Sequence, residues 1–103
     1  MRVIVMFDLP VTTDIEKREY RVFRKFLISE GFMMMQESVY SKLALNNSVV
    51  QAVRGNLVTH KPKFGLVQVL VLTEKQYANM DLLVGEISGD VINTVDRLVI
   101  IWI

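Results

Sequence analysis

Asp8 is the residue whose type and position best suit chemistry in this sequence. It lies near the end of an apolar, β-branched run over residues 2–10, which predicts a strand closed by a proline that cannot continue a ladder. The run is apolar on both faces, which indicates a central strand covered on each side. Open α/β sheets tend to place reactive groups at the carboxyl ends of such strands. The alternative interpretation is a carboxylate that caps the following turn through backbone N–H groups.

A divalent cation is the cofactor that this carboxylate could hold. Mg²⁺ sites commonly use one or two carboxylates, with waters and substrate phosphates as the other ligands. A twofold-symmetric dimer would supply a second copy of Asp8 if the strand ends face each other across the axis. Such a pair could hold a metal-activated water against a phosphodiester. The sequence therefore makes Asp8 the candidate catalytic residue and the candidate Mg²⁺ ligand.

The sequence lacks the residues that several other kinds of catalytic site require. The chain has no cysteine, which excludes disulfides and thiolate metal sites. It also lacks a glycine-rich phosphate loop, the nucleophile motif G-x-S-x-G and the zinc motif H-E-x-x-H. His60 is the only histidine, and its place at a predicted helix end is typical of a solvated or capping group.

Basic residues gather on a helix predicted over residues 13–30. Thr13 and Glu16 form a capping-box signature, and Gly31 suits the position after the last turn. The apolar face of the helix is expected to consist of Ile15, Val22, Phe23, Phe26 and Leu27. Basic residues lie off that face: Lys17, Arg18, Arg21, Arg24 and Lys25. They form either a solvated helix surface or a ridge that contacts nucleic-acid phosphates, and Lys61 and Lys63 add a basic loop.

The distribution of charge and the hydropathy of the chain bear on its oligomeric state and its cellular location. The net charge is +1, but residues 1–63 carry an excess of four positive charges and residues 64–103 an excess of three negative ones. The chain is 51% hydrophobic with a mean hydropathy of +0.34, which favours apolar surface covered in an oligomer. No apolar run reaches the roughly 18 residues of a membrane span, and the N-terminus has no signal-peptide pattern. We therefore expect a cytoplasmic protein.

The remaining segments predict the fold class. Residues 32–42 are expected to be one long bent strand or two short strands with a bulge at Gln36-Glu37. Asn46, Asn47 and Ser48 offer N-caps for a helix ending near His60. After it we expect a central strand over 64–73, a short helix or turn over 74–80, a short strand over 81–84, a polar loop over 86–90, a brief strand over 91–95, and an apolar strand over 98–103. The last strand must pair with its own sheet or a partner's. The order β-α-β-α-β-β fits one α+β domain over residues 1–103, a ferredoxin-like sandwich with two helices on one face.

Several motifs in this order resemble one known family. They are Val-x-Val-x-Phe-Asp-Leu-Pro at 3–10, the basic helix, Glu30-Gly31-Phe32, and Gln36-x-Ser38-Val39-Tyr40. On these motifs the chain resembles the second CRISPR-associated adaptation protein, "Cas-two". Two further stretches are similar to its type II-A branch, from systems with the Cas-nine effector: Ser41-Lys42-Leu43-x-Leu45-Asn46-Asn47 and Asp96-Arg97-Leu98-Val99.

The resemblance implies a ferredoxin-like homodimer whose late strand is added to the partner's sheet. It implies a role in spacer acquisition, with the dimer bridging two dimers of the CRISPR integrase protein and contacting double-stranded DNA. It also implies metal-dependent endonuclease activity on RNA or double-stranded DNA, with Asp8 at the Mg²⁺ position and the basic residues of the first helix and nearby loops on the duplex backbone. The alternative is a regulatory or toxin-type ferredoxin-like dimer that binds RNA or a small molecule, since the fold hosts many functions.

Overall fold

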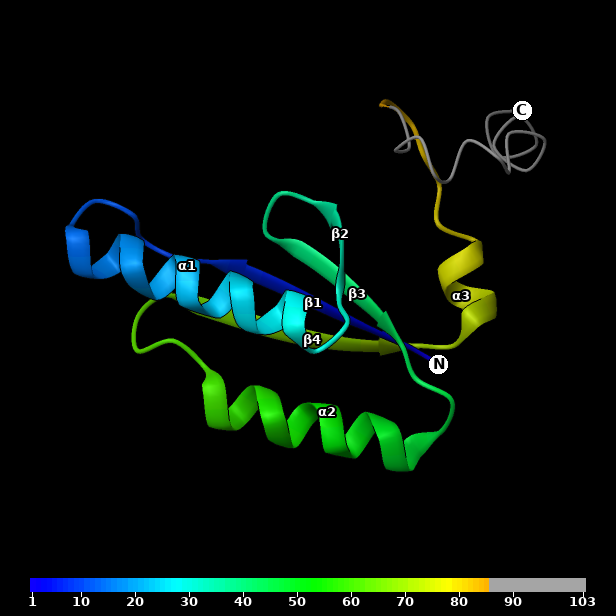
Figure 1. Cartoon of the computed structure of the whole chain (residues 1–103). Helices are drawn as coiled ribbons and strands as arrows, with labels where there is room; N and C mark the ends of the chain where they lie inside the picture. Colours follow the sequence, from blue (N-terminus) through cyan, green and yellow to red (C-terminus); the bar gives the residue numbers. More distant parts are fainter. Residues whose placement is uncertain (86–103) are drawn as a thin grey trace.

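The computed structural model of the chain describes residues 1–85 (Figure 1). Its elements in chain order are β1 Arg2–Asp8, α1 Asp14–Ser29, β2 Met33–Gln36, β3 Val39–Leu43, α2 Asn47–His60, β4 Leu66–Leu72 and α3 Glu74–Ala78. The four strands form one antiparallel sheet in the order β2-β3-β1-β4. The succession β-α-β-β-α-β that precedes α3 is ferredoxin-like, so the predicted α+β fold class is confirmed.

The core lies between one face of the sheet and the two long helices. Val3, Val5 and Phe7 alternate along β1 and are at most 6% exposed, as expected for the helix-facing side of a central strand. The helices complete this core with buried side chains: Phe23 and Leu27 from α1, and Val50, Val53 and Leu57 from α2. Since α1 and α2 both cover this face, neither covers the opposite one, which we call the open face (Figure 1).

The start and end of α1 follow the predicted capping signals. The Thr13 hydroxyl accepts a hydrogen bond from the Glu16 backbone N–H at 3.1 Å, and the Glu16 carboxylate accepts one from the Thr13 N–H at 2.9 Å. This bond from the Thr13 backbone holds the pKa of Glu16 below its ordinary value. After the last turn, Gly31 adopts a φ of 94°, which glycine tolerates without strain. The capping box and the terminal glycine are both confirmed.

The buried face of α1 differs from the predicted one. Phe23 and Leu27 are buried as expected and Phe26 is half-buried, but Ile15 and Val22 are 67% and 55% exposed. The side facing the sheet runs instead through Tyr20, Phe23 and Leu27. Successive helical residues are about 100° apart, so positions 15 and 22 lie roughly a third of a turn away from that contact. The prediction was wrong for Ile15 and Val22 because the apolar face of α1 is broad and the sheet covers only part of it.

Residues 32–42 form two strands rather than one bent strand. β2 and β3 pair as a hairpin, and the turn between them consists of Glu37 and Ser38. Ser38 has a φ of 66°, a conformation required by the tight reversal. The register shifts between Met34 and Gln36, so an irregularity lies just before the predicted position. The prediction of two short strands is therefore confirmed. The connection between them is a turn, where a bulge was expected.

The second long helix, α2, forms over the predicted residues. The Asn46 side chain caps it by accepting a hydrogen bond from the Val49 N–H at 3.0 Å. It ends at His60, whose ring stacks on Phe26 of α1 with centroids 4.3 Å apart and planes 13° apart. His60 therefore connects the end of α2 to α1, in line with a structural role. Within residues 1–85, no helix has the length and apolar character that crossing a bilayer requires.

The chain after α2 departs from the prediction in two places. β4 forms, but among the described residues it pairs only with β1 and is an edge strand, not a central one. Residues 81–84 are not a strand: Leu83 and Val84 are about 90% exposed, and no strand within residues 1–85 lies beside them to bond to. The short helix predicted over 74–80 is confirmed as α3. The loop predicted over 86–90 and the strands predicted over 91–95 and 98–103 lie outside the described residues.

A side-chain clamp holds α3 at the start of β1. The Arg2 guanidinium donates two hydrogen bonds to the Glu74 carboxylate, at 3.1 and 2.7 Å. It also lies 4.3 Å from the centre of the Tyr77 ring. The hydrogen bond from Arg2 lowers the pKa of Glu74 below its ordinary value. These contacts therefore hold α3, the last described helix, beside the start of β1.

Candidate functional site

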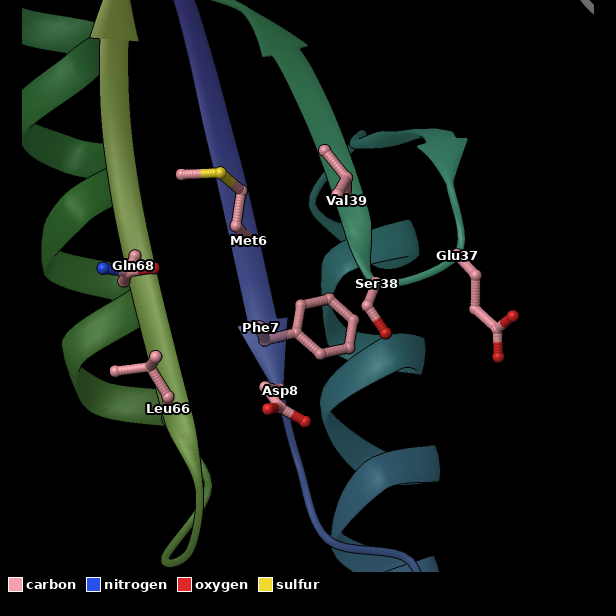
Figure 2. Close-up of a pocket in the computed structure, with 8 residues that line it drawn as sticks. All are labelled: Met6, Phe7, Asp8, Glu37, Ser38, Val39, Leu66 and Gln68. Carbon is pink, nitrogen blue, oxygen red and sulfur yellow. The ribbon is translucent and has the colours of Figure 1, made fainter. Parts of the chain in front are cut away.

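Asp8 ends the central strand and projects from the open face of the sheet. Val3, Val5 and Phe7 of β1 point into the helical core, so Met6 and Asp8 point the other way. Figure 2 looks onto this face, with the helix ribbons behind the strands. Asp8 is exposed and pairs in register with Leu66 of β4. The predicted position at the end of a central strand is confirmed.

Around Asp8 the open face is hollowed. A shallow hollow of about 300 Å³ is lined by Met6, Phe7, Asp8, Glu37, Ser38, Val39, Leu66 and Gln68 (Figure 2). Its floor is largely apolar, and its polar groups come from the end of β1, the hairpin turn and β4. The turn is fixed beside β1 because the Phe7 N–H donates to the Ser38 carbonyl at 3.0 Å. Three separate segments therefore line the hollow that contains Asp8.

Gly65 sets the backbone position of Asp8, a role that sequence reasoning missed. Its φ is 89°, which disfavours any other residue. A Cβ built on it would lie 2.6 Å from the Asp8 carbonyl oxygen and 2.8 Å from the Leu9 side chain. The only signal in the sequence was a glycine at the start of a strongly apolar strand, which can mark a close approach of two backbones.

The capping interpretation of Asp8 finds no support in the hydrogen bonds. Among residues 1–85 the Asp8 carboxylate has no hydrogen-bond partner, and the N-terminus of α1 is capped by Thr13 and Glu16 instead. An exposed carboxylate without a structural partner is free to bind a ligand. Asp8 is therefore better explained as a group available on the open face than as part of the turn.

Mg²⁺ fits this carboxylate as one half of a site. Carboxylate oxygens are the ligands that Mg²⁺ prefers, and the hollow leaves room for water and phosphate ligands. Within residues 1–85, no three His, Cys, Asp or Glu side chains gather closely enough to hold a metal ion. One protomer therefore offers Asp8 as its donor, and a complete site needs further ligands from a symmetry partner or a substrate.

The basic residues of α1 lie on the other side of the molecule. Lys17, Arg18, Arg21, Arg24 and Lys25 are all exposed and occupy the part of the helix that faces away from the core. Over residues 1–85 the one ion pair is that between Arg2 and Glu74, so none of these five cations is held in an ion pair. Lys61 and Lys63 are exposed in the loop that leads to β4. The sheet separates Asp8 from the α1 basic surface, so the structure does not combine them into one site.

The comparisons with known proteins agree with the fold and the motifs. The family model described as CRISPR associated protein Cas2 matches residues 1–80. A protein of Treponema denticola named CRISPR-associated endoribonuclease Cas2 is 50% identical over 98% of this chain and 100% of its own length. A Streptococcus mutans protein of the same name is 52% identical over 96% of this chain and 91% of its own. Such streptococcal relatives fit the type II-A branch.

A solved structure supports the fold independently. The crystal structure of Streptococcus pyogenes Cas2 at pH 6.5 superposes with a TM-score of 0.61, covering 81% of this chain and 99% of that chain, at 18% identity. This likeness concerns the fold, while the sequence matches concern the family. The chain belongs to the CRISPR associated protein Cas2 family.

Proposed function

We propose that this chain is a cytoplasmic CRISPR adaptation subunit, a homodimer that bridges DNA within the integrase complex during spacer acquisition. The observation that carries the proposal is the division of the molecule into two unlike surfaces. The helical side bears an exposed basic helix whose cations form no ion pair within residues 1–85, and the open face of the sheet is mainly apolar. The match to the CRISPR associated protein Cas2 family supports placing this role in CRISPR adaptation.

The open face supports the homodimer. Large apolar side chains on it are substantially exposed: Met33 at 65%, Leu43 at 49%, Leu66 at 53% and Leu70 at 46%. A monomeric soluble domain seldom leaves so much contiguous apolar surface in water. A twofold dimer that buries this face would bring two Asp8 carboxylates to the same interface. The predicted exchange of residues 98–103 between protomers belongs to this proposal.

The α1 basic surface supports binding of a duplex backbone. In a dimer joined by its open faces, the helical sides point outward, so both copies of α1 remain accessible. Five cationic side chains within nine residues would contact successive phosphates, and each contact releases counterions from the duplex. Lys61 and Lys63 would extend this surface. The integrase protein is the proposed macromolecular partner of the same dimer.

Charge reversal on α1 tests the DNA-bridging role. Arg21→Glu, alone and combined with Arg18→Glu, should weaken duplex DNA binding and reduce the salt slope by about 0.9 for each phosphate that the protein no longer neutralises. Lys75→Glu is the matched control for the single variant, because it changes the net charge equally on an exposed residue of α3. Spacer acquisition in cells should fall with the α1 variants and persist with the control. Unchanged duplex binding in the double variant would refute the role of this surface.

A second function is favoured by the unpartnered Asp8 carboxylate and by the relatives' names. We propose that the dimer also has Mg²⁺-dependent endonuclease activity on RNA or double-stranded DNA. Bound Mg²⁺ would supply Lewis-acid activation of water, and the paired Asp8 residues would hold the ion. Asp8→Asn should abolish metal-dependent cleavage while leaving the protein folded, because the side chain is exposed and makes no hydrogen bond in the described structure.

The two functions can be separated with this one substitution. Spacer acquisition that persists in Asp8→Asn while cleavage is lost would assign Asp8 to an activity that DNA bridging does not need. Loss of both functions in a folded dimer would place the carboxylate chemistry within adaptation itself. Cleavage that persists at full rate in Asp8→Asn would remove Asp8 from the active site. The regulatory or toxin-type alternative finds no specific support in the described residues.

A further inference from the structure

Arg24 differs from the other basic residues of α1 in having a fixed partner. Its Nε donates a hydrogen bond of 2.9 Å to the hydroxyl of Tyr40 on β3. Among residues 1–85, Lys17, Arg18, Arg21 and Lys25 make no side-chain hydrogen bond or ion pair. Those four long side chains are free to sample many rotamers in solution, whereas the Arg24 guanidinium is held in one place.

Tyr40 is a rigid support for this bond. Its side chain is 1% exposed, and its ring stacks on Phe7 with centroids 5.7 Å apart and planes 22° apart. Tyr40 also pairs in register with Val5 of β1 on one side and with Met34 of β2 on the other. The hydroxyl therefore has little freedom to move, and it fixes the orientation of the guanidinium that binds to it.

The chemistry of the guanidinium leaves its outer edge available. Nε uses one of the five N–H donors, and the two terminal nitrogens keep the other four. Arg24 as a whole is exposed, so these donors can reach a ligand in solution. Two parallel N–H groups match the spacing of two phosphate oxygens, a geometry that lysine cannot provide.

We propose that Tyr40 is a positioning residue that preorganises Arg24 as the bidentate phosphate contact of the α1 basic surface. The inference rests on the proposed function, because it assumes that this surface binds a nucleic-acid backbone. An arginine already held in its bound rotamer loses less conformational entropy on binding than a free one. Arg24 is thus the anchor of the surface, and the remaining cations contribute long-range attraction.

A purely structural bond between α1 and β3 is the competing explanation, and two measurements distinguish the roles. Tyr40→Phe removes the hydroxyl but keeps the ring and the number of positive charges. A structural role alone would change thermal stability and leave the affinity of the folded protein unchanged. A positioning role would weaken affinity at every salt concentration while the slope of log K against log salt stays the same, because the number of cations is unchanged.

The experiment measures binding of the full chain to a short blunt-ended DNA duplex over a salt series. Tyr40→Phe and Arg24→Lys should each weaken binding about three- to tenfold with an unchanged salt slope. Arg24→Ala should weaken it more and reduce the slope by about 0.9 for each Arg24 on the duplex. Tyr20→Phe is the matched control: Tyr20 also packs on Phe7, at 5.8 Å, but its hydroxyl has no hydrogen-bond partner among residues 1–85. It should bind as the wild type does.

A direct readout remains valid even if a Tyr40 variant folds poorly. In the wild type the Arg24 Nε–H should exchange slowly with solvent by NMR, and its signal should persist and shift when duplex is added. Wild-type affinity in folded Tyr40→Phe, or an Nε–H signal insensitive to duplex, would overturn the positioning role. If Arg18 and Arg21 variants lose binding while Arg24 variants do not, the role of Tyr40 and Arg24 is refuted but the proposed DNA-bridging function stands. If none of these variants loses binding, the proposed function fails with it.

Discussion

Replacing Gly65 with alanine should disrupt the strand end that carries Asp8. Gly65 has a φ of 89°, and the added methyl group would lie 2.6 Å from the Asp8 carbonyl oxygen. That oxygen belongs to the backbone, so the overlap cannot be relieved by rotating a side chain. Either β4 must move away from β1 or the chain must change its path at Gly65. Both changes displace Asp8 relative to the hollow on the open face.

Two separate effects determine how much stability Gly65→Ala loses. An L-residue with left-handed backbone angles costs about 1–2 kcal/mol. Relief of the steric overlap in a packed region adds about 1–3 kcal/mol. Gly65→Ala should therefore lower the free energy of unfolding by about 2–5 kcal/mol. For a domain of this size the melting temperature should fall by roughly 8–40 °C.

The same substitution elsewhere in the chain provides the control. Gly55 lies in α2 with no atom within 4 Å of an added Cβ. Gly55→Ala should raise the free energy of unfolding by about 0.5–1 kcal/mol, since alanine is the better helix former. Both variants are to be compared with wild type by urea denaturation at one protein concentration, because stability of a dimer depends on it.

Two chemically identical changes, Gly65→Ala and Gly55→Ala, should therefore shift the free energy of unfolding in opposite directions. If Gly65→Ala unfolds within about 0.5 kcal/mol of wild type, the close approach to Asp8 is not a constraint on this strand end. If Gly55→Ala is strongly destabilising, α2 is packed against something at that position. Metal-dependent cleavage should also fall in Gly65→Ala, even in conditions where the variant remains folded.

Two further predictions concern the termini of the helices. Thr13→Ala removes the hydroxyl that accepts from Glu16 and should lower the free energy of unfolding by about 1 kcal/mol, measured by urea denaturation, whereas Thr13→Ser should restore it. Glu74 has its pKa lowered below 4.5 by the hydrogen bond from Arg2, so its contribution to stability is present above pH 4.5 and disappears as the pH falls through the lowered pKa. Glu74→Gln should therefore be less stable than wild type at neutral pH and equal to it in acid. A difference that persists unchanged in acid would contradict the ion-pair explanation.

Local patterns were sufficient where one segment determines its own structure. The apolar run before Asp8 predicted a central strand, and the Thr13 and Glu16 signature predicted the start of α1. Both signals depend on residues within one or two turns of each other. Family membership could also be inferred from sequence, because it depends on short motifs in a fixed order.

Features that depend on distant segments could not be predicted. The bond between Arg24 and Tyr40 joins residues 16 positions apart and requires both the hairpin and the seating of α1 on the sheet. The exposure of Ile15 and Val22 has the same origin, since the periodicity of a broad apolar face does not show which part the sheet will cover. Residues 81–84 have strand-like composition, yet a strand requires a partner that this part of the described chain does not meet.

The two edges of the described sheet have opposite consequences for polymerisation. β2 is only four residues long and carries a register shift, so it offers a poor template for another strand. β4 offers seven residues without a charged side chain or proline, and its outer edge is unpaired among residues 1–85. A strand from another copy can therefore extend the sheet on the β4 side, but the growth has no continuation at β2. Where the added strand is β4 of the other copy, each open β4 edge is used once, so the extension ends in a closed pair of molecules and not in a fibre.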